Sequence, residues 1–144
     1  MKAVPHTPVV RTEPLRGLRI PFIQRATLSR GEDVEDVFLI DLGMRGAFAE
    51  RAAPLPVGER VTVRFTLPGN AIALVFESRV AWWHAAGESL VSKVLPAGLG
   101  LEFLEGSAED YRRLEQYLQE YLRREGAARR FHRSWPLSED GEER

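Results

Sequence analysis

Apolar and polar side chains alternate strictly along residues 60–67, and this alternation constrains the fold more than any other feature of the sequence. The apolar positions are Val61, Val63, Phe65 and Leu67. Successive side chains of a β-strand point to opposite faces, so this segment is predicted to form a strand with one buried and one solvated face. Pro68-Gly69-Asn70 provides a turn signal, and residues 71–83 have the β-branched and aromatic content of a second strand. The two segments predict an antiparallel hairpin.

Four more strands are predicted around this hairpin, over residues 20–28, 34–42, 47–50 and 98–103. Six short antiparallel strands predict an all-β dominated fold, a small six-stranded antiparallel β-barrel, because closing the sheet removes its exposed edges. The residues expected in its core are Phe22, Phe38, Val63, Phe65, Val80 and Leu101.

A C-terminal α-helix is predicted to follow the last strand and to lie over one opening of the barrel. The hydroxyl of Ser107 can cap its first turn, and Gly126 is the expected stop. The apolar residues at helical spacing on one face are Tyr111, Leu114, Leu118, Tyr121 and Leu122. The chain therefore divides into a flexible arm (1–15), a barrel domain with its helix (16–125) and a charged, disordered tail (126–144).

Composition excludes several classes of protein. The 144 residues contain no cysteine, so disulfides, thiolate nucleophiles and cysteine-bound metals are excluded. The three histidines have no metal-ligand spacing and no nucleophile or phosphate-loop motif is present, so we expect no enzyme activity, metal or cofactor. A net charge of −1 argues against nucleic acid as a partner. The longest apolar run, residues 71–76, is too short to cross a bilayer, which predicts a cytoplasmic protein without membrane insertion.

Two short motifs are suited to binding an anion. Arg16-Gly-Leu-Arg19 precedes the first strand, and Asp41-Leu-Gly-Met-Arg-Gly46 ends the second. An arginine fork can bind a phosphate or the edge of a guanine with two hydrogen bonds, and a carboxylate can accept from the guanine N1–H and N2–H₂ groups. The glycines permit close approach of the backbone.

With these motifs the sequence resembles the PilZ family of bacterial cyclic di-GMP receptor domains. The family has an Arg-x-x-x-Arg pair on a flexible arm, followed by an Asp/Asn-x-Ser-x-x-Gly motif. Arg19 matches the second arginine, and Asp41 and Gly46 match the ends of the second motif. Residues 79–82 and 98–103 resemble the closing strands of the family, so the similarity covers about residues 15–122. It implies a split barrel of PilZ type and a cyclic di-GMP site formed by Arg16, Arg19, Asp41, Gly43, Arg45 and Gly46.

Two residues differ from the family pattern. Leu15 stands at the position of the first arginine, and Gly43 stands where the pattern has a serine. Arg16 can serve if the arm shifts by one residue, and Arg45 can supply a replacement cation. Restoring the pattern with Leu15→Arg and Gly43→Ser is expected to raise the affinity for the nucleotide about a hundredfold.

Three functions follow from these observations. The first is a non-enzymatic cyclic di-GMP receptor that acts by ligand-dependent contact with a partner protein. The second is a PilZ domain that has lost nucleotide binding and works as a protein-interaction adaptor, with the exposed helix face and the charged tail as docking surfaces. The third is a barrel that binds single-stranded nucleic acid, although the aromatic residues are expected in the core or at its rim rather than on a stacking platform.

Overall fold

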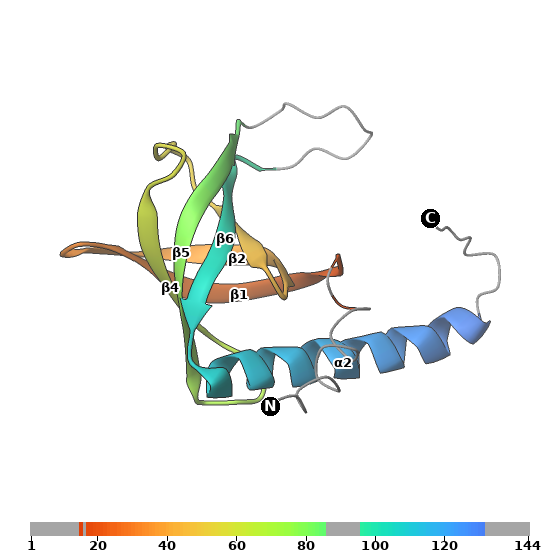
Figure 1. Cartoon of the computed structure of the whole chain (residues 1–144). Helices are drawn as coiled ribbons and strands as arrows, with labels where there is room; N and C mark the ends of the chain where they lie inside the picture. Colours follow the sequence, from red (N-terminus) through yellow and green to blue (C-terminus); the bar gives the residue numbers. More distant parts are fainter. Residues whose placement is uncertain (1–14, 16, 86–95, 132–144) are drawn as a thin grey trace.

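The computed structural model describes residue 15, residues 17–85 and residues 96–131, and in this part of the chain six antiparallel strands form a closed barrel (Figure 1). Their order around the barrel is β1-β2-β3-β6-β5-β4. The elements are β1 (Arg19–Arg30), β2 (Asp33–Gly43), β3 (Gly46–Glu50), β4 (Arg60–Thr66), β5 (Ala73–His84), β6 (Gly98–Gly106) and the helix α2 (Ala108–Phe131). The predicted six-stranded antiparallel barrel with a C-terminal helix is confirmed.

The β4–β5 hairpin has the pairing that the alternating sequence predicts. Val63 of β4 lies opposite Phe76 of β5, and both side chains are completely buried. In the turn, Gly69 adopts a φ of 76°, which glycine tolerates better than other residues. The carboxamide oxygen of Asn70 accepts a hydrogen bond from the backbone N–H of Ile72 at 2.8 Å. Turn chemistry and hydrophobic pattern therefore specify the same register.

Helix α2 lies across one end of the barrel, where its apolar face completes the core (Figure 1). Leu114 and Leu118 are completely buried against the strands. The ring of Tyr117 packs edge-on against Phe22 of β1, with 5.8 Å between the ring centroids. The predicted apolar face of the helix is confirmed, and it fills the opening that the strands leave.

Helix α2 begins where the sequence predicts but ends later than predicted. The start is confirmed, because the hydroxyl of Ser107 accepts a hydrogen bond from the backbone N–H of Asp110 at 3.0 Å. The predicted stop at Gly126 is wrong, since the helix continues to Phe131. One glycine costs a helix only about 1 kcal/mol, and the alanines and arginines of residues 127–130 are strong helix formers. Residues 126–131 of the predicted tail therefore belong to the helix.

Five of the six predicted core residues are buried: Phe22, Val63, Phe65, Val80 and Leu101. Phe38 is the exception, with 44% of its surface exposed. Its neighbours Val37 and Leu39 occupy the inward positions of β2, so the alternation of the strand places Phe38 outside. There the guanidinium of Arg25 lies 5.5 Å from the centre of its ring.

The predictions for the two chain ends lie largely outside the described residues. Residues 1–14, Arg16 and residues 132–144 belong to that undescribed part. Leu15, the last residue of the predicted flexible arm, is only 1% exposed and belongs to the core instead. No helix in the described part of the chain is long and apolar enough to cross a membrane.

Truncating Phe65 tests which face of β4 is buried. We expect Phe65→Ala to lower the free energy of unfolding by about 3–5 kcal/mol, because the ring is packed among other aromatic rings of the core. Phe38→Ala is the matched control on the outer surface and is expected to cost about 1 kcal/mol or less. Chemical denaturation measures both. Equal losses for the two variants would contradict the assignment of the faces.

The ion pair between Glu35 and Arg51 gives a pH-dependent contribution to stability. Arg51 donates from Nε to Glu35 at 2.6 Å and from Nη2 at 3.1 Å, and these hydrogen bonds lower the pKa of Glu35 below its ordinary 4.5. A lowered folded-state pKa stabilises the protein above the unfolded-state value, and this stabilisation is lost as the pH falls through the folded-state pKa. We therefore expect Glu35→Gln to flatten the fall in stability below about pH 4.5, measured by denaturation at a series of pH values. An unchanged pH profile would disprove the contribution.

Candidate functional site

The structure brings Arg19 and Asp41 of the two sequence motifs together on the outer surface of the barrel. Arg19 begins β1, Asp41 lies near the end of β2, and Nη2 of Arg19 is 2.9 Å from Oδ1 of Asp41. The same Oδ1 accepts a hydrogen bond from the backbone N–H of Phe48 in β3, also at 2.9 Å. Asp41 is thus held in place from two sides, while the side chains of Arg19 and Asp41 stay 41% and 36% exposed. A polar ligand can reach both.

Gly43 permits a close contact between the start of β1 and the end of β2. It lies opposite Arg19, and a Cβ added at Gly43 would be 2.5 Å from the carbonyl oxygen of Leu18 and 2.9 Å from Cδ of Arg19. The stem of Arg19 therefore passes directly over Gly43. A serine at this position, as in the family pattern, would require the backbone at Leu18 to move.

Gly46 has a structural role in the β3–β6 pairing. A Cβ at this position would lie 1.9 Å from the carbonyl oxygen of Leu101, a distance that no side chain can adopt. Gly46 pairs with Glu102 of β6, so glycine is required for these two strands to approach. The strand pairing therefore explains the glycine at this motif position without any ligand.

Leu15 anchors the chain before β1. Its side chain is almost completely buried with the core cluster, and the backbone N–H of Leu18 donates to the carbonyl oxygen of Leu15 at 3.1 Å. At this position the family pattern has an arginine, which would carry a charge into the core. The chain thus holds the entry to β1 with an apolar contact instead of leaving a cation available for a ligand.

Of Arg16 and Arg45, the other two predicted site residues, Arg45 forms no side-chain hydrogen bond or ion pair with Arg19 or Asp41 in the part of the chain that the structure describes. Arg16 lies outside the described residues. Arg45 is exposed between β2 and β3, and within the described part of the chain its guanidinium forms no ion pair. Its backbone carbonyl accepts a hydrogen bond from Phe103 at 2.7 Å, which ties this turn to β6.

An aromatic patch beside Asp41 was missed by the sequence analysis. Asp41 pairs with Phe48, Phe48 with Gly100, and Gly100 with Trp82, so these residues form one row across four strands. Trp82 is 44% exposed, and its ring centroid is 5.3 Å from that of the buried Phe48. A Cβ at Gly100 would lie 2.1 Å from Nε1 of Trp82, so the indole rests on the backbone of β6.

The sequence does contain a signal for this patch. In β6, glycines at positions 98 and 100 alternate with buried leucines, which leaves the first two outward positions of the strand without side chains. Neighbouring aromatic rings can cover such a strip. Trp82 was instead expected in the core or at its rim, because a single strand does not reveal what lies opposite its outward residues.

The assembled site contains a cation, a carboxylate and an exposed indole on one surface. No group of three or more metal-ligating side chains occurs among the described residues. The three groups together are suited to recognising a phosphate and a planar base.

Comparison with known proteins identifies the family. The model of the PilZ domain matches residues 11–120, so the chain belongs to the PilZ domain family. No curated protein sequence matches the chain significantly.

Several solved structures share the fold at low sequence identity. The PilZ domain of YcgR from Escherichia coli, with c-di-GMP, has a TM-score of 0.56 and 21% identity over 82% of this chain and 96% of that chain. MotI, the inhibitor of motility of Bacillus subtilis, has a TM-score of 0.61 and 18% identity over 74% of this chain. PlzA of Borreliella burgdorferi, in complex with c-di-GMP, has a TM-score of 0.54 and 12% identity over 95% of this chain and 61% of that chain. The match spans only half of the MotI chain.

The close contact at Gly43 changes the expected outcome of restoring the family pattern. We expect Gly43→Ser to lower the free energy of unfolding by about 1–3 kcal/mol, because the new Cβ meets a backbone oxygen. Gly17→Ser is the matched control, since a Cβ there meets nothing within 4 Å, and its cost should stay within about 0.5 kcal/mol. Chemical denaturation distinguishes the two. The hundredfold gain in affinity expected from the sequence requires that the serine fits without a shift of the backbone, and the contact with Leu18 opposes this. A stable Gly43→Ser variant that binds cyclic di-GMP more tightly would support the original expectation.

Proposed function

We propose that this chain is a non-enzymatic cyclic di-GMP receptor module of the PilZ family, working in the bacterial cytoplasm through ligand-dependent contact with a partner protein. The observation that carries the proposal is the meeting of Arg19 and Asp41, from two distant motifs, on one exposed surface. Membership of the PilZ family and the c-di-GMP present in the YcgR and PlzA structures support this ligand.

Each group of the site has a distinct task in the proposed complex. Arg19 donates its fork to a phosphate or to O6 and N7 of a guanine. Asp41 accepts from the guanine N1–H and N2–H₂ groups through Oδ2, because Oδ1 already accepts from Phe48. The exposed face of Trp82 offers a surface on which a second base can stack.

Removing Arg19 tests the nucleotide site directly. We expect Arg19→Ala to weaken cyclic di-GMP binding by about 1.5–3 kcal/mol, which is roughly tenfold to a hundredfold, because a charge-assisted fork is lost. Arg25→Ala is the matched control on the same strand. Arg25 contacts Phe38 and Asp36 and no residue of the site, so its removal should change the affinity far less. Isothermal titration calorimetry measures both, and equal effects would disprove the assignment of Arg19.

A second candidate function is a protein-interaction adaptor without nucleotide binding. Two observations favour it: Leu15 is buried where the family has an arginine, and Arg19 is already paired with Asp41. In the adaptor the ion pair and the buried leucine hold the surface in one state without any ligand. Titration of the wild-type chain with cyclic di-GMP separates the two functions, since absence of heat and of spectral shifts at high micromolar concentration selects the adaptor.

A further inference from the structure

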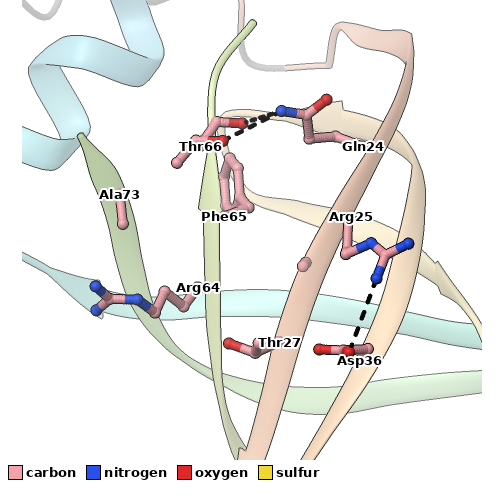
Figure 2. Close-up of a pocket in the computed structure, with 9 residues that line it drawn as sticks. Gln24, Arg25, Thr27, Asp36, Arg64, Phe65, Thr66 and Ala73 are labelled. Carbon is pink, nitrogen blue, oxygen red and sulfur yellow. Dashed lines mark hydrogen bonds and ion pairs between the residues drawn. The ribbon is translucent and has the colours of Figure 1, made fainter. Parts of the chain in front are cut away.

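A groove runs along the outside of the barrel between β1 and β4, and it shares no residue with the proposed nucleotide site. Its volume is about 410 Å³, and Figure 2 shows the side chains that surround it. The residues used below are Gln24, Arg25, Thr27, Asp36, Arg64 and Thr66. The proposed site extends from Arg19 at the start of β1 over β2, β3, β6 and β5, whereas the groove lies farther along β1, over its seam with β4.

The groove exists because β1 and β4 separate along part of their length. Their pairing ends at Ala26 and Phe65. Beyond this pair the carboxamide nitrogen of Gln24 bridges the gap, donating to the carbonyl oxygen of Thr66 at 2.9 Å and to its hydroxyl at 3.2 Å. A side chain thus replaces the missing ladder hydrogen bonds, as Figure 2 shows, and it lines the groove.

The groove carries an excess of positive charge. Arg64 is exposed and forms no ion pair within the described ranges of the chain. Arg25 has one partner, Asp36, at 3.9 Å, and both of these side chains are about two-thirds exposed, at 68% and 65%. Such a long, solvated ion pair contributes little, so a carboxylate from outside can compete with Asp36 for Arg25.

Three exposed apolar side chains belong to residues that are next in sequence to a residue lining the groove or in contact with one. Ile23 is 70% exposed and precedes Gln24, and Ile72 is 51% exposed and precedes Ala73, which lines the groove. Phe38, 44% exposed, lies beneath the guanidinium of Arg25. Large apolar side chains gathered around two arginines are characteristic of a surface that binds another protein.

We propose that this groove is the docking surface for a partner protein, and that it takes an acidic segment in which aliphatic side chains flank the carboxylates. The carboxylates pair with Arg25 and Arg64, and the aliphatic groups cover Ile23, Phe38 and Ile72. Charge complementarity selects the acidic segment, because the groove offers two cations against the single carboxylate of Asp36. The residues of this docking site are separate from those of the proposed nucleotide site, so each site can be tested without the other.

The test uses the full chain and a pooled library of short peptides built from leucine, isoleucine, glutamate and aspartate in random order. A second library carries lysine in place of the acidic residues. We expect the acidic library to yield binders, and the binding of an enriched peptide to shift the NMR amide signals of residues 24–27 and 64–66. Arg25→Glu combined with Arg64→Glu should weaken that peptide about tenfold or more. Phe38→Ser should also weaken it, through the lost apolar contact.

Arg60→Glu is the matched control for charge. Arg60 is exposed on the same strand as Arg64 but does not line the groove, so this variant should bind the peptide nearly as well as the wild type. An equal loss with Arg60→Glu would overturn the proposal, as would the failure of the acidic library to yield any binder. A single-stranded oligonucleotide is titrated in the same way. If it shifts the same amide signals at a lower concentration than the peptide requires, the groove is a nucleic-acid site and the proposal is overturned. The variant with Arg25→Glu and Arg64→Glu is also titrated with cyclic di-GMP, which reports on the proposed nucleotide site separately from the groove.

Discussion

The short seam between β1 and β4 is the constraint on which the barrel depends. Four residue pairs, from Ala26 opposite Phe65 to Ser29 opposite Thr62, close the sheet on itself. Without them β1 and β4 would each present an unpaired edge. Since β1 also pairs with β2 from Arg19 to Arg30, this single strand carries both the closure of the barrel and the first residue of the proposed nucleotide site.

The energies of two contacts indicate which one limits nucleotide binding. Exposed ion pairs such as Arg19–Asp41 stabilise a protein by about 0–1 kcal/mol, so a ligand can displace this pair at little cost. Losing a buried leucine such as Leu15 costs about 2–5 kcal/mol. The buried leucine, rather than the ion pair, therefore sets how far the entry to β1 can rearrange around a nucleotide.

The fold followed from the sequence wherever one element contains its own signal. The alternation in β4, the turn at Gly69 and the cap at Ser107 are local features, and they placed the strands and the start of α2 correctly. Phe38 was misplaced because its aromatic ring was assigned to the core although its neighbours Val37 and Leu39 fill the inward positions. Hydrophobicity alone does not decide a face when a strand has apolar residues on both sides.

The candidate site was predictable only in part, because it depends on contacts between strands. The resemblance to the family identified Arg19 and Asp41 as candidate site residues, and in the structure their side chains are in contact. The burial of Leu15 and the contact of Gly43 with Leu18 involve residues whose neighbours are set by the closed barrel. The row from Asp41 to Trp82 likewise crosses four strands. A sequence pattern read one strand at a time contains none of these distances.

The bulge in β1 lies between Arg19 of the proposed nucleotide site and the residues of β1 that line the groove. The register between β1 and β2 shifts between Pro21 and Gln24, and only residues beyond this shift pair with β4. The first part of β1, which begins with Arg19, therefore pairs with β2 alone, while the part around Thr27 pairs with a strand on both sides. Gln24 at the rim of the groove lies on the same strand as Arg19 and beyond the β1–β4 pairing, whereas Thr27 and Arg64 are directly paired with each other. The rim at Gln24 is thus the part of the groove lining that lies nearest to Arg19 along β1, and it pairs with β2 alone.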